Sequence, residues 1–442
     1  MAGPPREYHF PKFDRRVLSN GLTLLVAPSH NLPIVTVLAI VDAGGVAEPA
    51  GKEGVAELTA RALNEGTPKY DGEVLTDYLE QLGTSVGGAA GWDSASLAMT
   101  VLRRNLENAF VHFAEVLVRP TFPVAAIERL KAERCAELMQ IESEPRELAD
   151  EKFDEYIYDT ASRFRLPLGG TAVSVQSLTR DDVVAFHAAR YQPSATTLIV
   201  VGDVEMDEVA ALVETGLGAW SGGDVVRKSA MDLPSRATRS VRIVGKEDAP
   251  QSEVRIGHVG VPRTHPDYFS ITVMNAVLGG LFSSRINLNL REVHGYTYGA
   301  SSAFDWRREA GPFVAGTAVA SDVTAPAIEE TLKEIDRMRS EPISESELSL
   351  ATSYLAGVFP IRYETTAAIA AALATLRIYG LPADWYDTYR SRIGAVSIDD
   401  VLAAARKHIR PDALQIVIVG DADAIRGPVE ALGLGPLDVT DP

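Results

Sequence analysis

Apolar positions along the chain follow two different periods, and both periods recur in its two halves. Segments 22–26 and 34–41 are rich in apolar and β-branched residues, and Asn20-Gly21 supplies a turn signal before the first, so both predict strands. In segment 51–65 apolar residues recur every three or four positions, which predicts a helix. The same criteria predict strands at 198–201, 253–259, 298–304 and 313–318, and helices at 111–118, 125–141, 179–190, 268–277, 284–293 and onward to residue 392.

The order of these elements indicates the fold class. Strands and helices mix in each half without the regular strand–helix–strand alternation that builds a parallel sheet. We therefore expect α+β domains, each with a mainly antiparallel sheet covered by helices.

One series of features occurs twice at a constant offset. An Asp-Val pair, a proline and a strand-like run that ends in Gly-Asp follow one another in both halves. The paired residues Asp182 and Asp400, Pro193 and Pro411, and Asp203 and Asp421 are each 218 residues apart. Such a fixed period predicts two similar domains of roughly 200 residues that arose by duplication.

A polar segment with Gly, Ser and Pro separates the two halves. Residues 221–238 have the composition of an interdomain linker. We predict an N-terminal domain at 12–222, a linker at 223–239 and a C-terminal domain at 240–435.

Charge and cysteine content narrow the class of protein. The 442-residue chain has 42 basic and 60 acidic residues, a formal net charge of −18. This excess repels a phosphate backbone, so nucleic acid is not an expected partner; the charge favours solubility, or a preference for basic substrates. The single cysteine, Cys135, excludes an internal disulfide framework and is typical of a reducing compartment.

Targeting signals give an expected location. The N-terminus shows no basic stretch followed by an apolar run, so we expect a cytoplasmic protein, or a periplasmic one if a leader was removed. No run of about 20 continuous apolar residues occurs, so no membrane span is expected.

Several segments together resemble one known family. The run Arg16–Val26, the block Gly54–Thr67, and the block Leu278–Tyr298 are similar in sequence and order to the pitrilysin/insulinase family of zinc metallopeptidases, which includes processing peptidases. The resemblance extends from about residue 12 to about residue 432. It implies two α+β domains that face each other across a cavity for a peptide.

The zinc motif of that family is altered here. Active members carry His-x-x-Glu-His, in which two histidines on one helix face bind zinc and the glutamate is the general base. This chain has Glu57, Ala60 and Arg61 at the three positions. Alanine cannot accept a proton, and a protonated guanidinium has no lone pair for a metal. No metal is therefore expected in this chain.

The resemblance also indicates a third ligand position. Glu137 stands where the family has a glutamate on a later helix, although a carboxylate on a helix surface is the simpler interpretation. Glu57 and Arg61 are four residues apart, which predicts an ion pair across one helical turn.

No other catalytic pattern replaces the lost motif. None of the eight histidines is three or four residues from another; His258 and His265 are seven apart, which is a weak signal. Cys135 has the setting of a packing residue on an amphipathic helix, and neither a Gly-x-Ser-x-Gly elbow nor a phosphate loop occurs.

A second site of the family is retained. Arg291 and Tyr298 have the spacing of an Arg–Tyr pair that, in the family, binds the substrate backbone and stabilises the transition state. Without the resemblance, Arg291 would be expected to pair with a nearby acid and Tyr298 to pack at a sheet rim. Gly295 between them allows a turn from helix to strand.

This combination predicts a division of labour between two chains. The resemblance implies a non-catalytic subunit that gives Arg291 and Tyr298 to a homologous partner, which carries His-x-x-Glu-His and the zinc. A peptide or unfolded protein would bind as an added strand near 86–93. The alternatives are a non-enzymatic peptide-binding or structural core protein of the same fold, and a self-sufficient peptidase with an unusual metal site.

Overall fold

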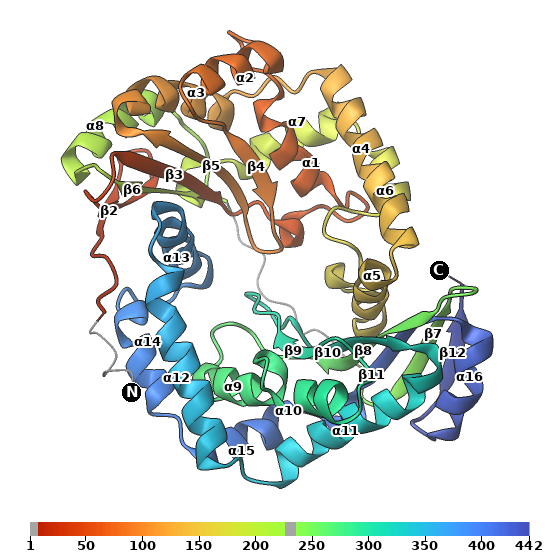
Figure 1. The fold of residues 1–442 in the computed structure, drawn as a ribbon. Coiled ribbons are helices and arrows are strands. Elements are labelled where there is room, and N and C mark those ends of the chain that lie inside the picture. The colour runs from red at the N-terminus through yellow and green to blue at the C-terminus, as the bar shows by residue number, and fades with distance from the viewer. Residues whose placement is uncertain (1–7, 226–235, 442) are drawn as a thin grey trace. The chain divides into compact units, whose positions relative to one another are not determined.

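The computed structural model describes residues 8–225 and 236–441, which form two compact units (Figure 1). Unit 1 consists of the described residues within 1–138, 167–229 and 359–387. Unit 2 consists of those within 139–166, 230–358 and 388–442. Most of the predicted linker, residues 226–235, lies outside the described residues.

Unit 1 is built on a six-stranded sheet in the order β1-β2-β6-β3-β5-β4. Its strands are β1 (Asp14–Val17), β2 (Thr23–Pro28), β3 (Ile34–Val41), β4 (Gly87–Ala90), β5 (Ala95–Leu102) and β6 (Thr196–Gly202). Neighbouring strands are antiparallel except for β2 and β6, which are parallel. The strand β4 forms one edge of this sheet.

Helices cover both faces of the unit 1 sheet. On one side, α1 packs on β4 and β5, α3 packs on β5, and α8 packs on β2 (Figure 1). On the other side lies α13, on β3 and β6. The helices of this unit are α1 (Val55–Ala62), α2 (Gly72–Gln81), α3 (Leu106–Val118), α6 (Ala172–Ser177), α7 (Arg180–Arg190), α8 (Met206–Leu217) and α13 (Thr366–Tyr379). Burial on both faces explains why every residue of β6 is buried.

Unit 2 repeats this sheet in the order β12-β7-β11-β8-β10-β9. Its strands are β7 (Ser240–Gly245), β8 (Gln251–Val259), β9 (Ala300–Phe304), β10 (Pro312–Ala320), β11 (Gln415–Gly420) and β12 (Leu437–Thr440). The pairs of β7 with β11 and with β12 are parallel, and the rest are antiparallel. Both sheets are thus mixed but mainly antiparallel, and the α+β prediction is confirmed.

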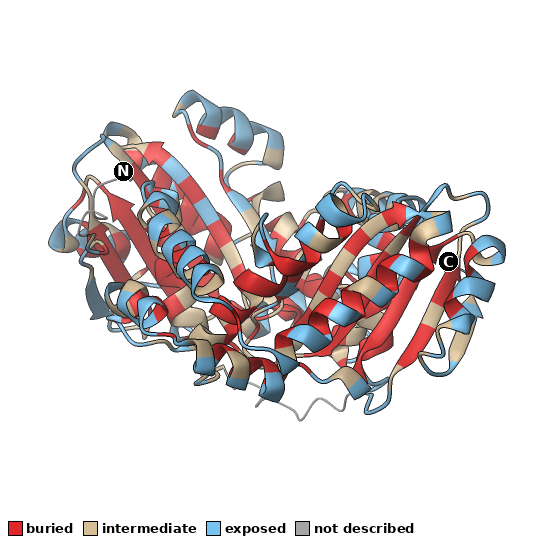
Figure 2. Ribbon diagram, turned by 60° about the horizontal axis from the view of Figure 1, so that its bottom comes forward, coloured by how far each residue is buried: buried red, intermediate tan, exposed pale blue. Residues whose placement is uncertain are grey.

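The helices of unit 2 also lie on both faces of their sheet. They are α5 (Pro145–Ile157), α9 (Tyr268–Asn275), α10 (Arg285–Asn287), α11 (Thr324–Ser340), α15 (Ile398–His408) and α16 (Ala422–Ala431). The long helices α4 (Val124–Ser143), α12 (Glu345–Arg362) and α14 (Trp385–Gly394) each run across a boundary between the units. Buried positions concentrate along the central strands of the sheets and the inner faces of the helices (Figure 2).

The two halves of the chain exchange one helix each. From the first half, α5 packs on β8 and β11 of unit 2, where the Tyr156 hydroxyl donates to Ser240 Oγ at 2.7 Å. From the second half, α13 packs on β3 and β6 of unit 1, where Arg377 Nε donates to Thr197 Oγ1 at 2.9 Å. The units are therefore discontinuous in sequence, unlike the continuous domains 12–222 and 240–435 that the sequence predicted.

The structure explains the repeat with an offset of 218 residues. Asp182 and Asp400 are the third residues of α7 and α15, and each forms a capping box with the N-cap, Thr179 or Ser397. Pro193 and Pro411 open matching 3₁₀ turns, which lead into the equivalent central strands β6 and β11. The repeat thus preserves a helix start, a turn and a buried strand.

The first predicted helix is shorter than expected. Residues 51–65 were predicted as one helix, but α1 begins at Val55 and tightens into a 3₁₀ turn at Leu63–Glu65. Gly51 and Gly54 have φ angles of 79° and 95°, a left-handed conformation that ends a right-handed helix. The Glu48 carboxylate accepts hydrogen bonds from the Gly54 and Ala56 amides, both at 3.0 Å, and so caps the helix start.

One helical run, Tyr268–Val293, is long and apolar enough to cross a membrane by length and composition. Of its most apolar window, 56% is buried in the structure, as in the core helix of a globular domain. The run therefore carries no argument for a membrane span.

Candidate functional site

The altered zinc motif forms an ion-pair cluster between α1 and α4 in unit 1. Arg61 Nη1 donates to both carboxylate oxygens of Glu137, at 2.9 and 3.2 Å. Glu133 Oε2 lies 3.6 Å from Arg61 Nη2, and Glu57 Oε1 lies 3.9 Å from Arg61 Nη1. The guanidinium therefore stands among three carboxylates, at the motif position where the family has a zinc ligand.

A second arginine completes the cluster. Arg134 Nη1 donates to Glu137 Oε2 at 3.2 Å, and its Nε donates to the Gly169 carbonyl at 3.3 Å. A Cβ at Gly169 would lie 2.7 Å from both Arg134 Nε and Glu57 Oε2, so the backbone closes tightly over the cluster. Burial tends to raise the pKa of Glu137, but hydrogen bonds from Arg61 and Arg134 outweigh it and hold that pKa below its ordinary value. Glu137 is thus an ionised partner of two arginines.

The position of the general base is closed. Ala60 is fully buried, and its carbonyl would lie 2.0 Å from a Cβ at Gly88 of β4. This side of α1 therefore packs directly on the edge strand and presents no group that can accept a proton from water. The two changes of residue type remove both the base and the ligand.

The structure changes the predicted partnership of Arg61. The sequence predicted an ion pair between Glu57 and Arg61, but that pair is the longest in the cluster, and Glu137 is the main partner. Sequence reasoning also missed Glu133 and Arg134. Both residues precede Glu137 on the same helix, Glu133 by four positions and Arg134 by three. This spacing was the sequence signal that the three side chains lie on one helix face.

The edge strand β4 lies within the predicted substrate segment 86–93. Its only strand partner among the described residues is β5, so its outer edge is open to pairing. Gly88 allows the close approach of α1, whereas a Cβ at Gly87 would meet nothing within 4 Å. The close packing of α1 on β4 therefore explains why a residue without a side chain stands at position 88.

A cavity of about 770 Å³ lies within unit 2. Residues of β8, β10 and β9 line it along the sheet, together with Arg146 and Asp150 of α5. Arg255, in its wall, is buried and pairs with Asp150 and Glu253. Phe282 and Tyr298 also line this cavity.

Tyr298 presents its phenol to solvent at the cavity. The residue is 93% exposed, and its hydroxyl has no hydrogen-bond partner within residues 8–225 and 236–441. Tyr298 lies three residues after Gly295. The left-handed conformation of Gly295, with a φ of 66°, ends the helical run before β9. Tyr298 therefore does not pack at a sheet rim, although Arg291 does pair with a nearby acid, Glu292, as that alternative expected.

Arg291 belongs to a π-helical turn, Leu288–Val293, at the end of the same run. Its Cζ lies 4.6 Å from the ring centroid of Phe282, and its Nε lies 3.4 Å from Glu292 Oε1. π-Helical turns are frequent at functional sites. Arg291 does not line the cavity itself, but it contacts Phe282, which does.

Two models of one family match this chain. One, described as insulinase (peptidase family M16), matches residues 24–166, and the other, described as the peptidase M16 inactive domain, matches residues 177–355. The non-peptidase homolog YmxG of Helicobacter pylori is 23% identical over 400 residues, with 89% of this chain and 90% of that protein covered.

Two further similarities agree with these matches. A probable mitochondrial-processing peptidase subunit beta from Schizosaccharomyces pombe is 28% identical over 281 residues, which cover 61% of this chain and 59% of that protein. The match thus spans less than two thirds of the yeast protein. A crystal structure of a peptidase M16 inactive domain from Pseudomonas fluorescens superposes with a TM-score of 0.87 at 25% identity, covering 92% of this chain and 98% of the other.

The fold and the altered motif define a class: a peptidase-like protein that lacks the residues for the family's zinc site. The chain belongs to peptidase family M16, the insulinase family, which confirms the resemblance stated from the sequence.

Proposed function

We propose that this chain is the non-catalytic, substrate-binding subunit of a heterodimeric zinc metalloendopeptidase. In this proposal a homologous chain with His-x-x-Glu-His holds the zinc, and this chain supplies Arg291 and Tyr298 to the joint site. The observation that carries the proposal is the contrast between two positions. An ion-pair cluster has replaced the zinc motif, while the phenol of Tyr298 remains fully presented to solvent.

The chemistry of these two side chains suits peptide-bond hydrolysis. A guanidinium and a phenol both donate hydrogen bonds, and neither needs to change its protonation state to do so. Aimed at a peptide carbonyl, they stabilise the negative charge that develops on its oxygen in the transition state. Contact with the Phe282 ring restricts Arg291, which lowers the entropy lost when the guanidinium orients on a substrate.

The open edge of β4 supports the binding of an extended peptide or unfolded segment as an added strand. Backbone hydrogen bonds along that edge would give affinity with little dependence on sequence. The relative named as a processing-peptidase subunit supports a partner subunit here. The relative named as a non-peptidase homolog supports a chain that is inactive alone.

The test is purification of the tagged full-length chain from its native host, followed by identification of co-eluting proteins by mass spectrometry. We expect a stoichiometric chain of similar length with His-x-x-Glu-His, and peptide cleavage by the pair but by neither chain alone. Arg291→Ala should then lower turnover by about 10²-fold or more without separating the chains.

Arg426→Ala, an exposed arginine on α16, is the matched control and should leave turnover unchanged. Equal turnover of the Arg291→Ala and control complexes would remove Arg291 from the site. A stable assembly without any zinc-motif chain would favour the non-enzymatic peptide-binding or structural function.

A further inference from the structure

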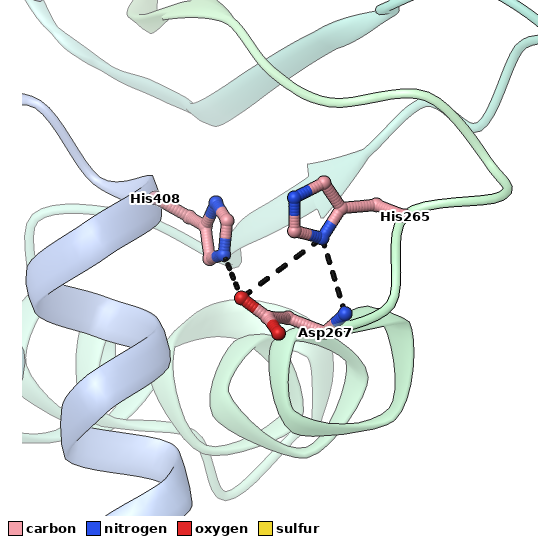
Figure 3. A group of neighbouring side chains, drawn as sticks. All are labelled: His265, Asp267 and His408. Carbon is pink, nitrogen blue, oxygen red and sulfur yellow. Dashed lines mark hydrogen bonds and ion pairs between the residues drawn. The ribbon is translucent and has the colours of Figure 1, made fainter.

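His265 and Asp267, two residues apart in sequence, meet the distant His408 in unit 2 (Figure 3). His265 comes from the loop after β8, Asp267 directly precedes α9, and His408 ends α15. Asp267 Oδ2 lies 2.7 Å from His408 Nε2 and 3.9 Å from His265 Nδ1. The sequence offered only the weak pair of His258 and His265, whereas the structure joins His265 to His408.

A backbone hydrogen bond fixes the tautomer of His265. The Asp267 amide donates to His265 Nδ1 at 3.1 Å, so this nitrogen is unprotonated and the His265 ring carries any single proton on Nε2.

We propose that His265, Asp267 and His408 form a binding site for a divalent transition-metal ion of the zinc class. Their candidate donor atoms all lie within 4.8 Å of one another. Ligands at tetrahedral zinc are separated by about 3.3 Å, given bonds of about 2.0–2.1 Å. Asp267 Oδ2 lies 2.7 and 3.9 Å from the two histidine nitrogens, on either side of that value, and those nitrogens lie within 4.8 Å of each other, so side-chain movement would complete the site.

Three interactions must give way when the ion binds. The hydrogen bond from the Asp267 amide to His265 Nδ1 breaks, so that this lone pair can turn to the metal. The proton that His408 Nε2 shares with Asp267 leaves to solvent, and Lys407, whose Nζ lies 2.8 Å from Asp267 Oδ2, moves away. Lys407 is 61% exposed at its side chain, so it can return to water. His265 and Asp267 are partly exposed, which leaves a fourth coordination position for water.

The ion would tie the end of α15 to the start of α9. These helices already pack on each other, and the helical run that starts with α9 continues to the turn that carries Arg291. The expected role is therefore structural bracing of that run. This site is independent of the zinc proposed for the partner chain and of the function proposed above.

The test uses the full-length chain, stripped with a chelator and titrated with Zn²⁺ against a chromogenic competitor. We expect one saturable equivalent and a higher Tm in the presence of Zn²⁺. His265→Asn should weaken binding by at least about tenfold, since loss of even an outer-shell partner costs about 10–100-fold in affinity. Lys407→Gln should tighten binding, because it removes the competing cation.

His30→Asn is the matched control, because His30 also pairs with carboxylates, Asp203 and Glu205, but in unit 1. It should bind Zn²⁺ as the unaltered protein does. Circular dichroism confirms that each variant is folded, and Lys407→Gln keeps the test decisive if His265→Asn unfolds. Absence of saturable binding, equal affinity with His265→Asn, or weaker binding with Lys407→Gln would each overturn the proposal.

Discussion

The Arg61 guanidinium donates hydrogen bonds to both carboxylate oxygens of Glu137, across 76 positions of sequence. By the resemblance to the family, both positions would correspond to those of zinc ligands. A fixed positive charge here balances the carboxylates that remain, and it also repels a metal ion. The altered motif therefore has a structural role, because its ion pairs hold α1 against α4.

The bond between Arg61 and Glu137 should be measurable as a coupling energy. In a double-mutant cycle with Arg61→Ala and Glu137→Gln, we expect about 1 kcal/mol at pH 7, because both side chains are partly exposed. The folded-state pKa of Glu137 is lowered, so this contribution is present above its ordinary pKa and is lost as pH falls through the folded value. Denaturant unfolding at several pH values gives the coupling.

The surface pair Arg337 and Glu341 is the matched control, and it should couple by no more than about 0.5 kcal/mol. A coupling between Arg61 and Glu137 no larger than in this pair would show that the cluster contributes nothing special to stability.

Two histidines should restore a metal site in unit 1. Glu57→His with Arg61→His places imidazoles four residues apart on α1, beside the Glu137 carboxylate that Arg61 has released. In a His265→Asn background, which weakens the proposed site in unit 2, we expect one equivalent of Zn²⁺ to bind at least about tenfold more tightly than it binds to the background protein. Adding Glu137→Gln should weaken this binding, and the same affinity in its presence would exclude Glu137 as a ligand. No peptidase activity is expected, because Ala60 provides no base.

The contact between α1 and β4 predicts different costs at two adjacent glycines. A Cβ at Gly88 would lie 2.0 Å from the Ala60 carbonyl, so Gly88→Ala must push the strand from the helix. We expect a loss of about 2–3 kcal/mol in unfolding free energy. Gly87→Ala meets nothing within 4 Å and is the matched control, with a change below about 1 kcal/mol. Equal effects at both positions in denaturant unfolding would contradict the close packing.

Glu347 should make stability depend on acid pH. Its carboxylate accepts from Arg285 Nε at 2.6 Å and from the Ser344 amide at 2.7 Å. Burial opposes its ionisation, but the bonds from Arg285 and Ser344 outweigh it and lower the pKa to about 2. We expect Glu347→Gln to cost on the order of 2 kcal/mol at pH 7, because the buried Arg285 loses its partner.

The sign of this effect follows from the lowered pKa. Glu347 stabilises the fold fully above its ordinary pKa of 4.5, and the benefit disappears as pH falls toward 2. The unfolding free energies of the unaltered protein and Glu347→Gln should therefore converge near pH 2. Glu345→Gln, an exposed residue on the same helix, is the control and should show no such convergence. A constant difference across the pH range would contradict the assignment.

Much of the fold could be predicted because it depends on local patterns. The strand predicted at 34–41 is β3 as observed, and the helix predicted at 179–190 is α7, which Thr179 caps. The absence of a base at Ala60 and of a ligand at Arg61 also needed only residue types. The spacing of three residues between Arg134 and Glu137 on one helix was a further local signal.

The sequence by itself determined the repeat, the element types, the family and the loss of the zinc motif, because each depends on residue chemistry or short-range periodicity. Only the tertiary structure decided that α5 and α13 exchange between the halves, since nothing in a helix's own pattern says which sheet will bury it. It also decided that Glu137 is the main partner of Arg61, and that His265 meets His408. Those contacts join residues across long loops, and their positions follow from the packing of whole elements.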